Sequence, residues 1–283
     1  MGKIQKAKTM AGVSSEVIRA GGATGDLRLH EFRSRVFRNK RFLRVWLPPG
    51  YDDAQNVERR YPALYLNDGQ NLFEASTSFT GVEWQVDETA DRFIREDAVP
   101  PLIIVGMDNA GKDRLREYMP HRSMHPMMLR VQGRYYPDFL MKEVMPFVER
   151  NYRVATGPEN TGLGGSSLGA LIALYTAVVR PEVIGRLLLE SPSLWVSHRQ
   201  AIKESRAVRI WPERIFLAAG TAEAGSEERS RTVVDDVREL AAILRRAVLS
   251  ERRLRLVIKD GAGHNEGAWA ERFPEALQFL FGA

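Results

Sequence analysis

Short apolar stretches alternate with longer segments of helical periodicity along most of the chain. The apolar runs at 102–106 and 187–189 lack alternating polar residues, which is typical of strands buried on both faces of a parallel sheet. Residues 84–96 and 135–150 instead repeat apolar side chains at the spacing of an amphipathic helix. The other predicted elements are strands over 27–37, 41–47, 61–66, 161–165, 214–219 and 254–258, and helices over 168–179, 230–247 and 269–281.

Strands that alternate with helices predict βαβ units and an α/β fold, with a mostly parallel central sheet of about eight strands and helices on both faces. We expect one domain over 26–283, because no linker divides the chain, and a flexible N-terminal lead-in over 1–25 that ends in a Gly-rich turn. Residues 107–134 have weak periodicity and predict a long excursion over the sheet, of the kind that usually shapes a site. A solvated loop without a role is the alternative.

Composition excludes several classes of protein. The 44% of hydrophobic residues supply a large core and rule out wholesale disorder. A net charge of +5 over 283 residues is mild; it permits an anionic substrate, and no aromatic-basic motif indicates a nucleic-acid binder. No stretch approaches the roughly 20 apolar residues of a membrane span, and the N-terminus lacks the continuous apolar run of an export signal. We therefore expect a cytoplasmic protein, although a chain trimmed of its signal would look the same.

The sequence gives little support for a metal or cofactor. It has no cysteine, which excludes disulfides, thiolate metal sites and a cysteine nucleophile. The five histidines form no zinc-ligand motif. We expect no metal and no cofactor, and a small-molecule ester as the partner; homodimerisation is left open.

The strongest chemical motif is Gly165-Ser166-Ser167-Leu168-Gly169, which fits G-x-S-x-G with Ser167 at its centre. A predicted strand precedes the motif and an apolar helix follows, so the serine stands on a tight turn that exposes its hydroxyl. The turn also directs the helix N-terminus and the Leu168 N–H at a developing oxyanion. Ser167 is therefore the candidate nucleophile, and a small-residue turn of purely structural use is the alternative.

A serine nucleophile needs a base, and the base needs an orienting acid; in sheets of this kind the order along the chain is serine, acid, histidine. Of the two histidines downstream, His264 follows the last strand at once, whereas no strand leads to His198. Glu223 lies nearest the end of the preceding strand and is our candidate acid. Other carboxylates in this part of the chain are Glu227, Glu228 and Asp260. The first two are expected to begin the next helix, where acids favour the helix dipole, and the third is too close to the histidine in sequence.

Three further segments supply candidate contacts for a reacting ester. The loop after the 61–66 strand is expected to give the second oxyanion donor, from the N–H of Gly69 or Gln70. Trp195 could wall the acyl or alcohol pocket, or else fill an edge of the core. Arg114 and Arg116, in the excursion, suggest an anionic or polyhydroxylated ligand, with a surface role as the alternative.

Seven segments in order carry a resemblance to a known family: 47–51 (LPPGY), 61–73, 105–109, 165–169, 191–195, 220–223 and 263–265. With them, the chain resembles, over roughly residues 27–281, the putative esterase family of α/β-hydrolases. This is the group of esterase D, enterochelin esterase, bacterial feruloyl and acetylxylan esterases and the mycolyltransferases, and the enterochelin-esterase-like branch is the most similar. The resemblance implies Ser167 as nucleophile, Glu223 as acid and His264 as base, with the oxyanion loop at 69–70. Two departures are Ala170, where a second glycine is common, and a glutamate where the acid is often aspartate.

The residues and the resemblance together favour a serine-dependent carboxylic-ester hydrolase that works through an acyl-enzyme with a Ser-His-Glu triad. The expected substrate is a small or polyhydroxylated ester, such as a siderophore lactone or a feruloyl or acetyl sugar ester. One alternative is an acyltransferase on the same fold. The other is a catalytically silent binding protein, against which the complete set of serine, acid and histidine argues.

Overall fold

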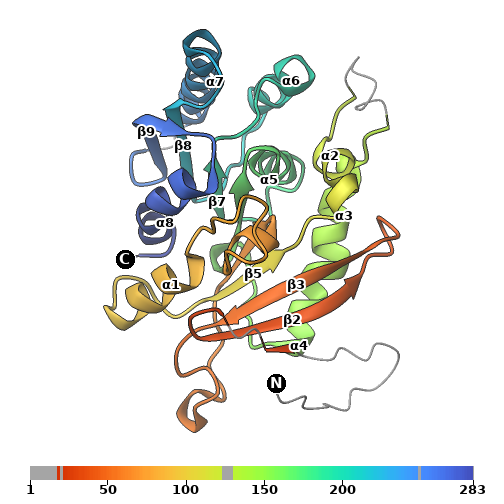
Figure 1. Cartoon of the computed structure of the whole chain (residues 1–283), viewed down its shortest axis with the longest axis vertical. Coiled ribbons are helices and arrows are strands. Elements are labelled where there is room, and N and C mark those ends of the chain that lie inside the picture. Colours follow the sequence, from red (N-terminus) through yellow and green to blue (C-terminus); the bar gives the residue numbers. More distant parts are fainter. Residues whose placement is uncertain (1–17, 20–21, 123–129, 248–249, 283) are drawn as a thin grey trace.

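A computed structural model describes residues 18–19, 22–122, 130–247 and 250–282 of the chain. Within these residues nine strands form one sheet in the order β1-β2-β3-β5-β4-β6-β7-β8-β9, with helices on both sides (Figure 1). The strands are β1 Ile18–Arg19, β2 Asp26–Arg33, β3 Lys40–Leu47, β4 Ala63–Asn67, β5 Ile103–Met107, β6 Thr161–Ser166, β7 Arg186–Glu190, β8 Arg214–Ala222 and β9 Leu254–Gly263. The α-helices are α1 Val86–Arg95, α2 Arg114–Tyr118, α3 Tyr136–Phe139, α4 Met145–Asn151, α5 Leu168–Val179, α6 Val196–Ser205, α7 Glu227–Arg246 and α8 Glu266–Phe281.

The sheet is mostly parallel, as the sequence predicts. β4 to β9 run parallel to one another, whereas β1, β2 and β3 extend one edge with antiparallel pairings. All eight predicted strands are present, and the predicted α/β fold is confirmed. Because the six parallel strands point the same way, the loops that leave their carboxyl ends gather at one edge of the sheet, where α/β folds place their sites.

The ninth strand, β1, was not predicted. Ile18 pairs with Leu29 of β2 although it lies within the segment that the sequence indicates as a lead-in. Further along that segment, the Thr24 N–H donates to Asp87 Oδ2 at 2.6 Å and its carbonyl accepts from the Trp46 indole at 2.7 Å. The described residues before β2 are therefore bound to the domain rather than free of it.

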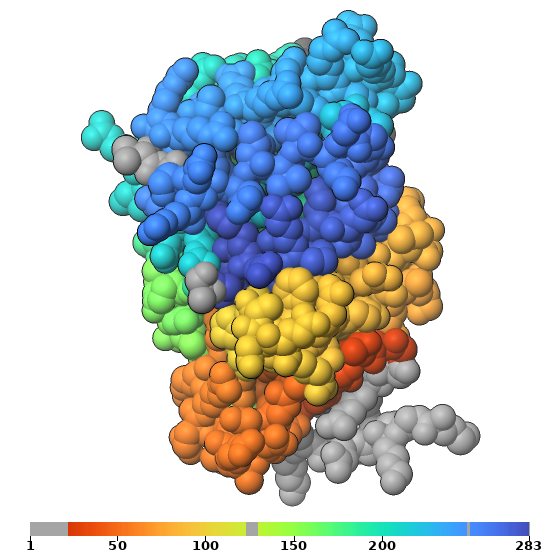
Figure 2. Space-filling model, turned by 90° about the vertical axis from the view of Figure 1, so that its left-hand side faces the viewer, coloured from red at the N-terminus to blue at the C-terminus, as the bar shows by residue number. Residues whose placement is uncertain are grey.

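The two faces of the sheet carry separate apolar layers. Along β4, Ala63 and Tyr65 face one layer and Leu64 and Leu66 face the other, because side chains alternate along a strand. The first layer includes residues of α3 to α7. The second is covered by α1 and α8, which lie side by side on this flank of the molecule (Figure 2). Burial on both faces explains the continuous apolar runs of the central strands.

Helix boundaries differ from the prediction where local chemistry intervenes. The helix predicted over 135–150 consists of α3, a π-helical stretch over Leu140–Val144 and α4. Pro146, in the first turn of α4, has no N–H to donate to the carbonyl four residues before it, so the regular α-helical ladder cannot pass through this point. The helices α2 and α6 are short and weakly periodic, and the sequence does not predict them. Among the described residues, no helix is both long and apolar enough to cross a membrane.

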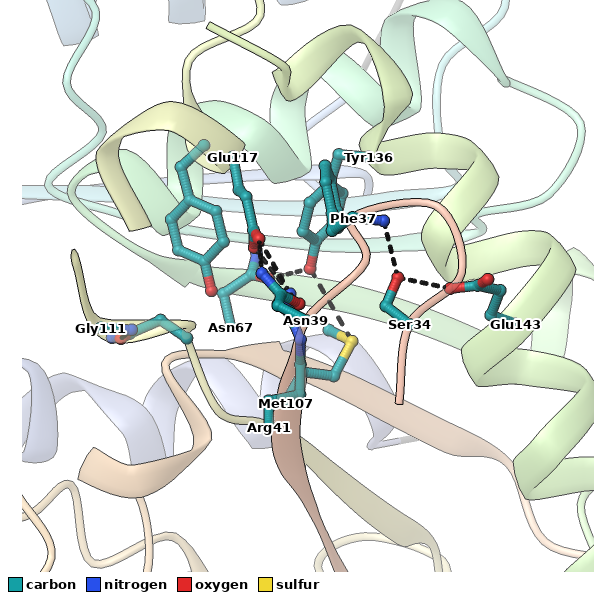
Figure 3. A network of polar contacts seen from close by, with 12 residues as sticks. Ser34, Phe37, Asn39, Arg41, Asn67, Met107, Gly111, Glu117, Tyr136 and Glu143 are labelled. Atoms are coloured by element: carbon teal, nitrogen blue, oxygen red, sulfur yellow. Dashed lines mark hydrogen bonds and ion pairs between the residues drawn. The ribbon is translucent and has the colours of Figure 1, made fainter. Parts of the chain in front are cut away.

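The excursion at 107–134 is fixed to the sheet by a buried polar network (Figure 3). Arg41 of β3 forms an ion pair with Glu117 of α2, with 2.8 Å between Nη2 and Oε2 and both side chains 1% exposed. The Asn39 side chain contacts both members of the pair. Next to it, the Tyr136 hydroxyl donates to the side chain of Asn67, which is the last residue of β4. These contacts hold α2 and α3 against the carboxyl edge; residues 123–129 of the excursion lie outside the described residues.

Candidate active site

Ser167 lies on a tight turn between β6 and α5. Its φ of 55° and ψ of −121° form a backbone conformation that non-glycine residues rarely adopt. Two backbone bonds clamp the turn to the end of β7: the Ser167 N–H donates to Glu190 at 2.9 Å, and the Ser193 N–H donates to the Ser167 carbonyl at 3.1 Å. Backbone strain of this kind costs about 1–3 kcal/mol and persists only where the surroundings determine it.

The glycines of the motif make room for Asn67. A Cβ atom on Gly165 would lie 2.9 Å from the Cβ of Asn67, closer than such atoms approach, and one on Gly169 would lie 3.0 Å from it, tighter than most such contacts. The Asn67 amide then donates to the Gly169 carbonyl at 2.8 Å, which ties the end of β4 to the first turn of α5. The N–H of Leu168, the first residue of α5, has no intrahelical partner because the helix begins there.

The hydroxyl of Ser167 has a polar neighbour that the sequence analysis did not name. In the part of the chain that the structure describes, Ser167 Oγ lies 3.2 Å from Ser193 Oγ and makes no hydrogen bond to the His264 imidazole. Catalytic hydrogen bonds of serine enzymes are often long without a substrate and tighten only in the complex.

Glu223 and His264, the acid and the base that the sequence predicts, are in contact. His264 Nδ1 lies 2.5 Å from Glu223 Oε2, and the Glu223 side chain is fully buried. The other carboxylate oxygen accepts the Ser191 hydroxyl and the Gly220 N–H, each at 2.6 Å. Burial alone would raise the pKa of Glu223, but the hydrogen bonds from His264, Ser191 and Gly220 outweigh it and hold the pKa below its ordinary value. An ionised Glu223 can only accept here, so a neutral imidazole carries its proton on Nδ1 and has its lone pair on Nε2.

The alternative residues lie elsewhere. Glu227 and Glu228 are the first residues of α7, as predicted. Asp260 lies on β9 and accepts from the Thr221 hydroxyl at 2.9 Å. His198 is exposed on α6.

The predicted oxyanion loop, Gly69 and Gln70, follows β4 and packs against the end of β5, and the preceding Asp68 approaches Gly169. A Cβ on Gly69 would lie 2.5 Å from the carbonyl carbon of Gly106, so only glycine fits. The Gln70 side chain accepts the Asn109 N–H at 3.1 Å. Asp68, the residue before the loop, is held by Arg114 through two bonds of 2.7 and 2.8 Å. The loop is thus fixed from both ends, with its N–H groups in the first turn of a short 3-10 helix.

The three predicted substrate contacts occupy different surroundings. Trp195 caps α6 two residues after Ser193 and is 56% exposed, so it is not a core residue. Arg116 is exposed on α2. Arg114 is only partly exposed, at 28%, and its guanidinium is committed to Asp68. The structure thus separates two arginines that the sequence analysis treated alike.

Two residues that support Glu223 are not predicted from the sequence. The Ser191 hydroxyl donates to Glu223, and the Trp269 indole N–H donates to Ser191 Oγ at 3.0 Å. Ser191 belongs to the 191–195 segment that carries the family resemblance, which was the one available signal. Within the described ranges, no group of three or more His, Asp or Glu residues is placed to hold a metal ion.

Comparisons with known proteins identify the family of this chain. The family model described as "Putative esterase" matches residues 34–280. The uncharacterized protein YbbA of Bacillus subtilis is 26% identical over 250 residues, which cover 86% of this chain and 93% of that protein. The ferri-bacillibactin esterase BesA of Bacillus subtilis is 26% identical over 226 residues, which cover 72% and 73%.

Solved structures share the fold. The BES protein from Bacillus cereus superimposes with a TM-score of 0.72 at 17% identity, over 96% of this chain and 100% of that one. At this identity the likeness establishes the architecture alone, whereas the family match extends over most of the chain. The chain therefore belongs to the esterase family and is a carboxylic ester hydrolase with an α/β-hydrolase type of fold.

Proposed function

We propose that this esterase works through an acyl-enzyme on Ser167, with His264 as general base and Glu223 as the acid that orients it. The observation that carries the proposal is the 2.5 Å contact between His264 Nδ1 and the fully buried carboxylate of Glu223. A surface histidine has no need of a buried, ionised partner, whereas a general base needs one to fix its tautomer. The strained turn at Ser167 lies at the same edge of the sheet.

The chemistry follows from these positions. On binding of the ester, the Ser167 hydroxyl turns from Ser193 to the imidazole and attacks the carbonyl carbon, while its proton passes to His264 Nε2. The N–H of Leu168 and that of Gly69 or Gln70 stabilise the oxyanion. The intermediate collapses as the alcohol leaves with the proton from Nε2. Water, deprotonated by the same nitrogen, then releases the acid and restores the serine.

The substrate class that we propose is a small or polyhydroxylated ester, with a siderophore lactone as the first candidate. One supporting observation is the relative that is named a ferri-bacillibactin esterase. The other is the exposed Trp195, an aromatic side chain that follows Ser193, the neighbour of Ser167, by two residues.

Hydrolysis of a p-nitrophenyl ester series tests the proposal. Ser167→Ala should lower kcat at least about 1,000-fold, because it removes the attacking atom, and a fluorophosphonate should label the wild type but not the variant. Ser205→Ala is the matched control: this buried serine on α6 donates to a backbone carbonyl, and its loss should leave turnover within about twofold. Turnover by Ser167→Ala close to that of the wild type, or a wild-type Ser167 that resists the fluorophosphonate, would contradict the proposal.

A further inference from the structure

The hydrogen bonds around Ser191 determine where its proton points. Ser191 Oγ has three polar neighbours: Trp269 Nε1 at 3.0 Å, Arg272 Nη2 at 3.5 Å and Glu223 Oε1 at 2.6 Å. An indole N–H and a guanidinium can only donate. The single proton of the serine therefore goes to Glu223, and the serine oxygen accepts from the other two.

The donors around Glu223 likewise favour its ionised form. Its Oε1 faces two donors, the Ser191 hydroxyl and the Gly220 N–H, so a proton on this oxygen would have no acceptor nearby. Hydrogen bonds to the charged form favour ionisation. Ser191 thus contributes directly to keeping the buried carboxylate charged opposite His264.

The donors to Ser191 come from α8, the helix that begins two residues after His264. Trp269 and Arg272 are three positions apart and so lie on one face of α8. Arg272 is held by the buried Glu190 at 2.8 Å, and Trp269 packs on Trp84 with 5.7 Å between ring centroids. The Trp269 ring also stands at 84° to the His264 ring, 5.2 Å away. One face of α8 therefore contacts both Ser191, which donates to the acid, and His264 itself.

The backbone at Ser191 adds an independent indication. Its φ of 45° lies in the left-handed region, which favours glycine. A serine in this conformation bears a backbone strain that a glycine would avoid. The hydroxyl is the group that a glycine lacks, which indicates that the hydroxyl has a role at this position.

We propose that Ser191 and Trp269 are positioning residues for the esterase: Trp269 orients the Ser191 hydroxyl, and this hydroxyl fixes Glu223 as the ionised partner of His264. This inference rests on the proposed function. Neither side chain is placed to react with the ester; both act through Glu223.

Ser191→Gly is the sharpest test, because it removes the hydroxyl while relieving the backbone, so the variant should fold. We expect kcat on p-nitrophenyl acetate to fall roughly tenfold to a hundredfold with KM within about threefold, since a hydrogen bond to a charged group is lost. The acidic limb of the kcat/KM profile should move up by about one pH unit, because the Glu223–His264 pair holds a proton more tightly without its donor. Ser205→Ala should change neither quantity.

Charged groups close to this pair among the described residues include Glu190 on β7 and Arg272 on α8. Burial raises the pKa of Glu190 to about 7 despite the neighbouring guanidinium. Glu190 can therefore change its charge within the pH range over which the profiles are measured. Both groups remain in the wild type and the variants, and only the difference between profiles is interpreted.

A double-mutant cycle separates positioning from general packing. Trp269→Phe keeps an aromatic ring and loses the N–H; alone it should lower kcat about threefold to tenfold, and in the Ser191→Gly background it should have no further effect. Independent, multiplying losses would overturn the inference, as would an unchanged kcat and acidic limb in Ser191→Gly.

A readout without turnover keeps the inference distinct from the proposed function. The wild type should show a downfield proton resonance from His264 Nδ1–H, and Ser191→Gly should shift it further downfield, because Glu223 without its Ser191 donor attracts this proton more strongly. An unchanged resonance refutes the role of Ser191 whatever the activity. A shifted resonance in a chain whose Ser167 resists the fluorophosphonate refutes the proposed nucleophile and leaves the role of Ser191 standing.

Discussion

Replacing Glu223 by glutamine tests the acid without changing its size. The amide can adopt two orientations, and its neighbours select one. Ser191 and the Gly220 N–H both donate to the Oε1 position, so the amide oxygen must face them and the NH₂ group must face His264. The imidazole then has to accept at Nδ1, which moves its proton to Nε2 and removes the base.

The expected loss is large because the tautomer itself changes. In serine proteases the corresponding aspartate-to-asparagine change lowers kcat by roughly 10⁴ for this reason, which corresponds to about 5 kcal/mol of transition-state stabilisation. The hydrogen bonds that select the amide orientation are short and the site is buried, so we expect a loss of similar order in Glu223→Gln. KM should change little, since the acid does not touch the ester.

The assay is steady-state hydrolysis of p-nitrophenyl acetate at pH 7 to 8, with two comparison variants. Glu223→Asp keeps the charge and the tautomer but withdraws the carboxylate by about 1.5 Å, and should lose only about tenfold to a hundredfold. Glu228→Gln, on the exposed first turn of α7, should behave as the wild type. Activity of Glu223→Gln within tenfold of the wild type, or a deeper loss in Glu223→Asp, would refute the reasoning about the tautomer.

Two other predictions concern stability and the oxyanion loop. Burial, with a smaller effect from Arg28, lowers the pKa of His30 to about 4. The unfolded chain therefore binds a proton below about pH 6.5 that the folded chain does not, and the free energy of unfolding should fall by about 2 kcal/mol from this group between pH 7 and 5. Urea titrations should show that His30→Gln reduces this slope; an undiminished slope would contradict the assignment. Arg114→Ala should lower kcat about tenfold by leaving the Asp68 carboxylate unpaired beside the developing oxyanion, whereas Arg116→Ala stays within about twofold. A rise in KM for an acidic ester with kcat intact would instead indicate direct substrate contact by Arg114.

The sequence predicts the acid, the base and the nucleophile for a common physical reason. Each candidate follows a predicted strand directly, and the carboxyl ends of parallel strands meet at one edge. Glu223 and His264 could therefore be paired before any coordinates were known, and the structure places them in contact. The end of β9 was predicted less well: Asp260-Gly261-Ala262-Gly263 has the composition of a turn, yet pairing with β8 continues to Gly263 past an irregularity.

The residues that support the acid could not be predicted in this way. Trp269 lies 46 positions after Glu223 and reaches Ser191 only because α8 packs back across β7 and β8. The sequence predicts a helix from Trp269 onward, and Trp269 is buried in the structure, but no local pattern indicates that its N–H has a partner at the site. Such contacts depend on tertiary packing, which local patterns do not encode.

Among the described residues, several Arg–carboxylate pairs of low exposure lie near the loops of the carboxyl edge, including Arg41–Glu117, Arg44–Asp108, Arg114–Asp68 and Arg272–Glu190. Buried ion pairs contribute little net stability, because the loss of hydration offsets their attraction, and apolar replacements are often as stable. Stability therefore does not explain their placement. A guanidinium fork does fix the direction of the carboxylate that it binds, which an apolar contact cannot do. The pairs join separate segments of the chain at the places where the loops must hold a defined geometry, so we infer that they serve the precision of the site rather than the stability of the sheet.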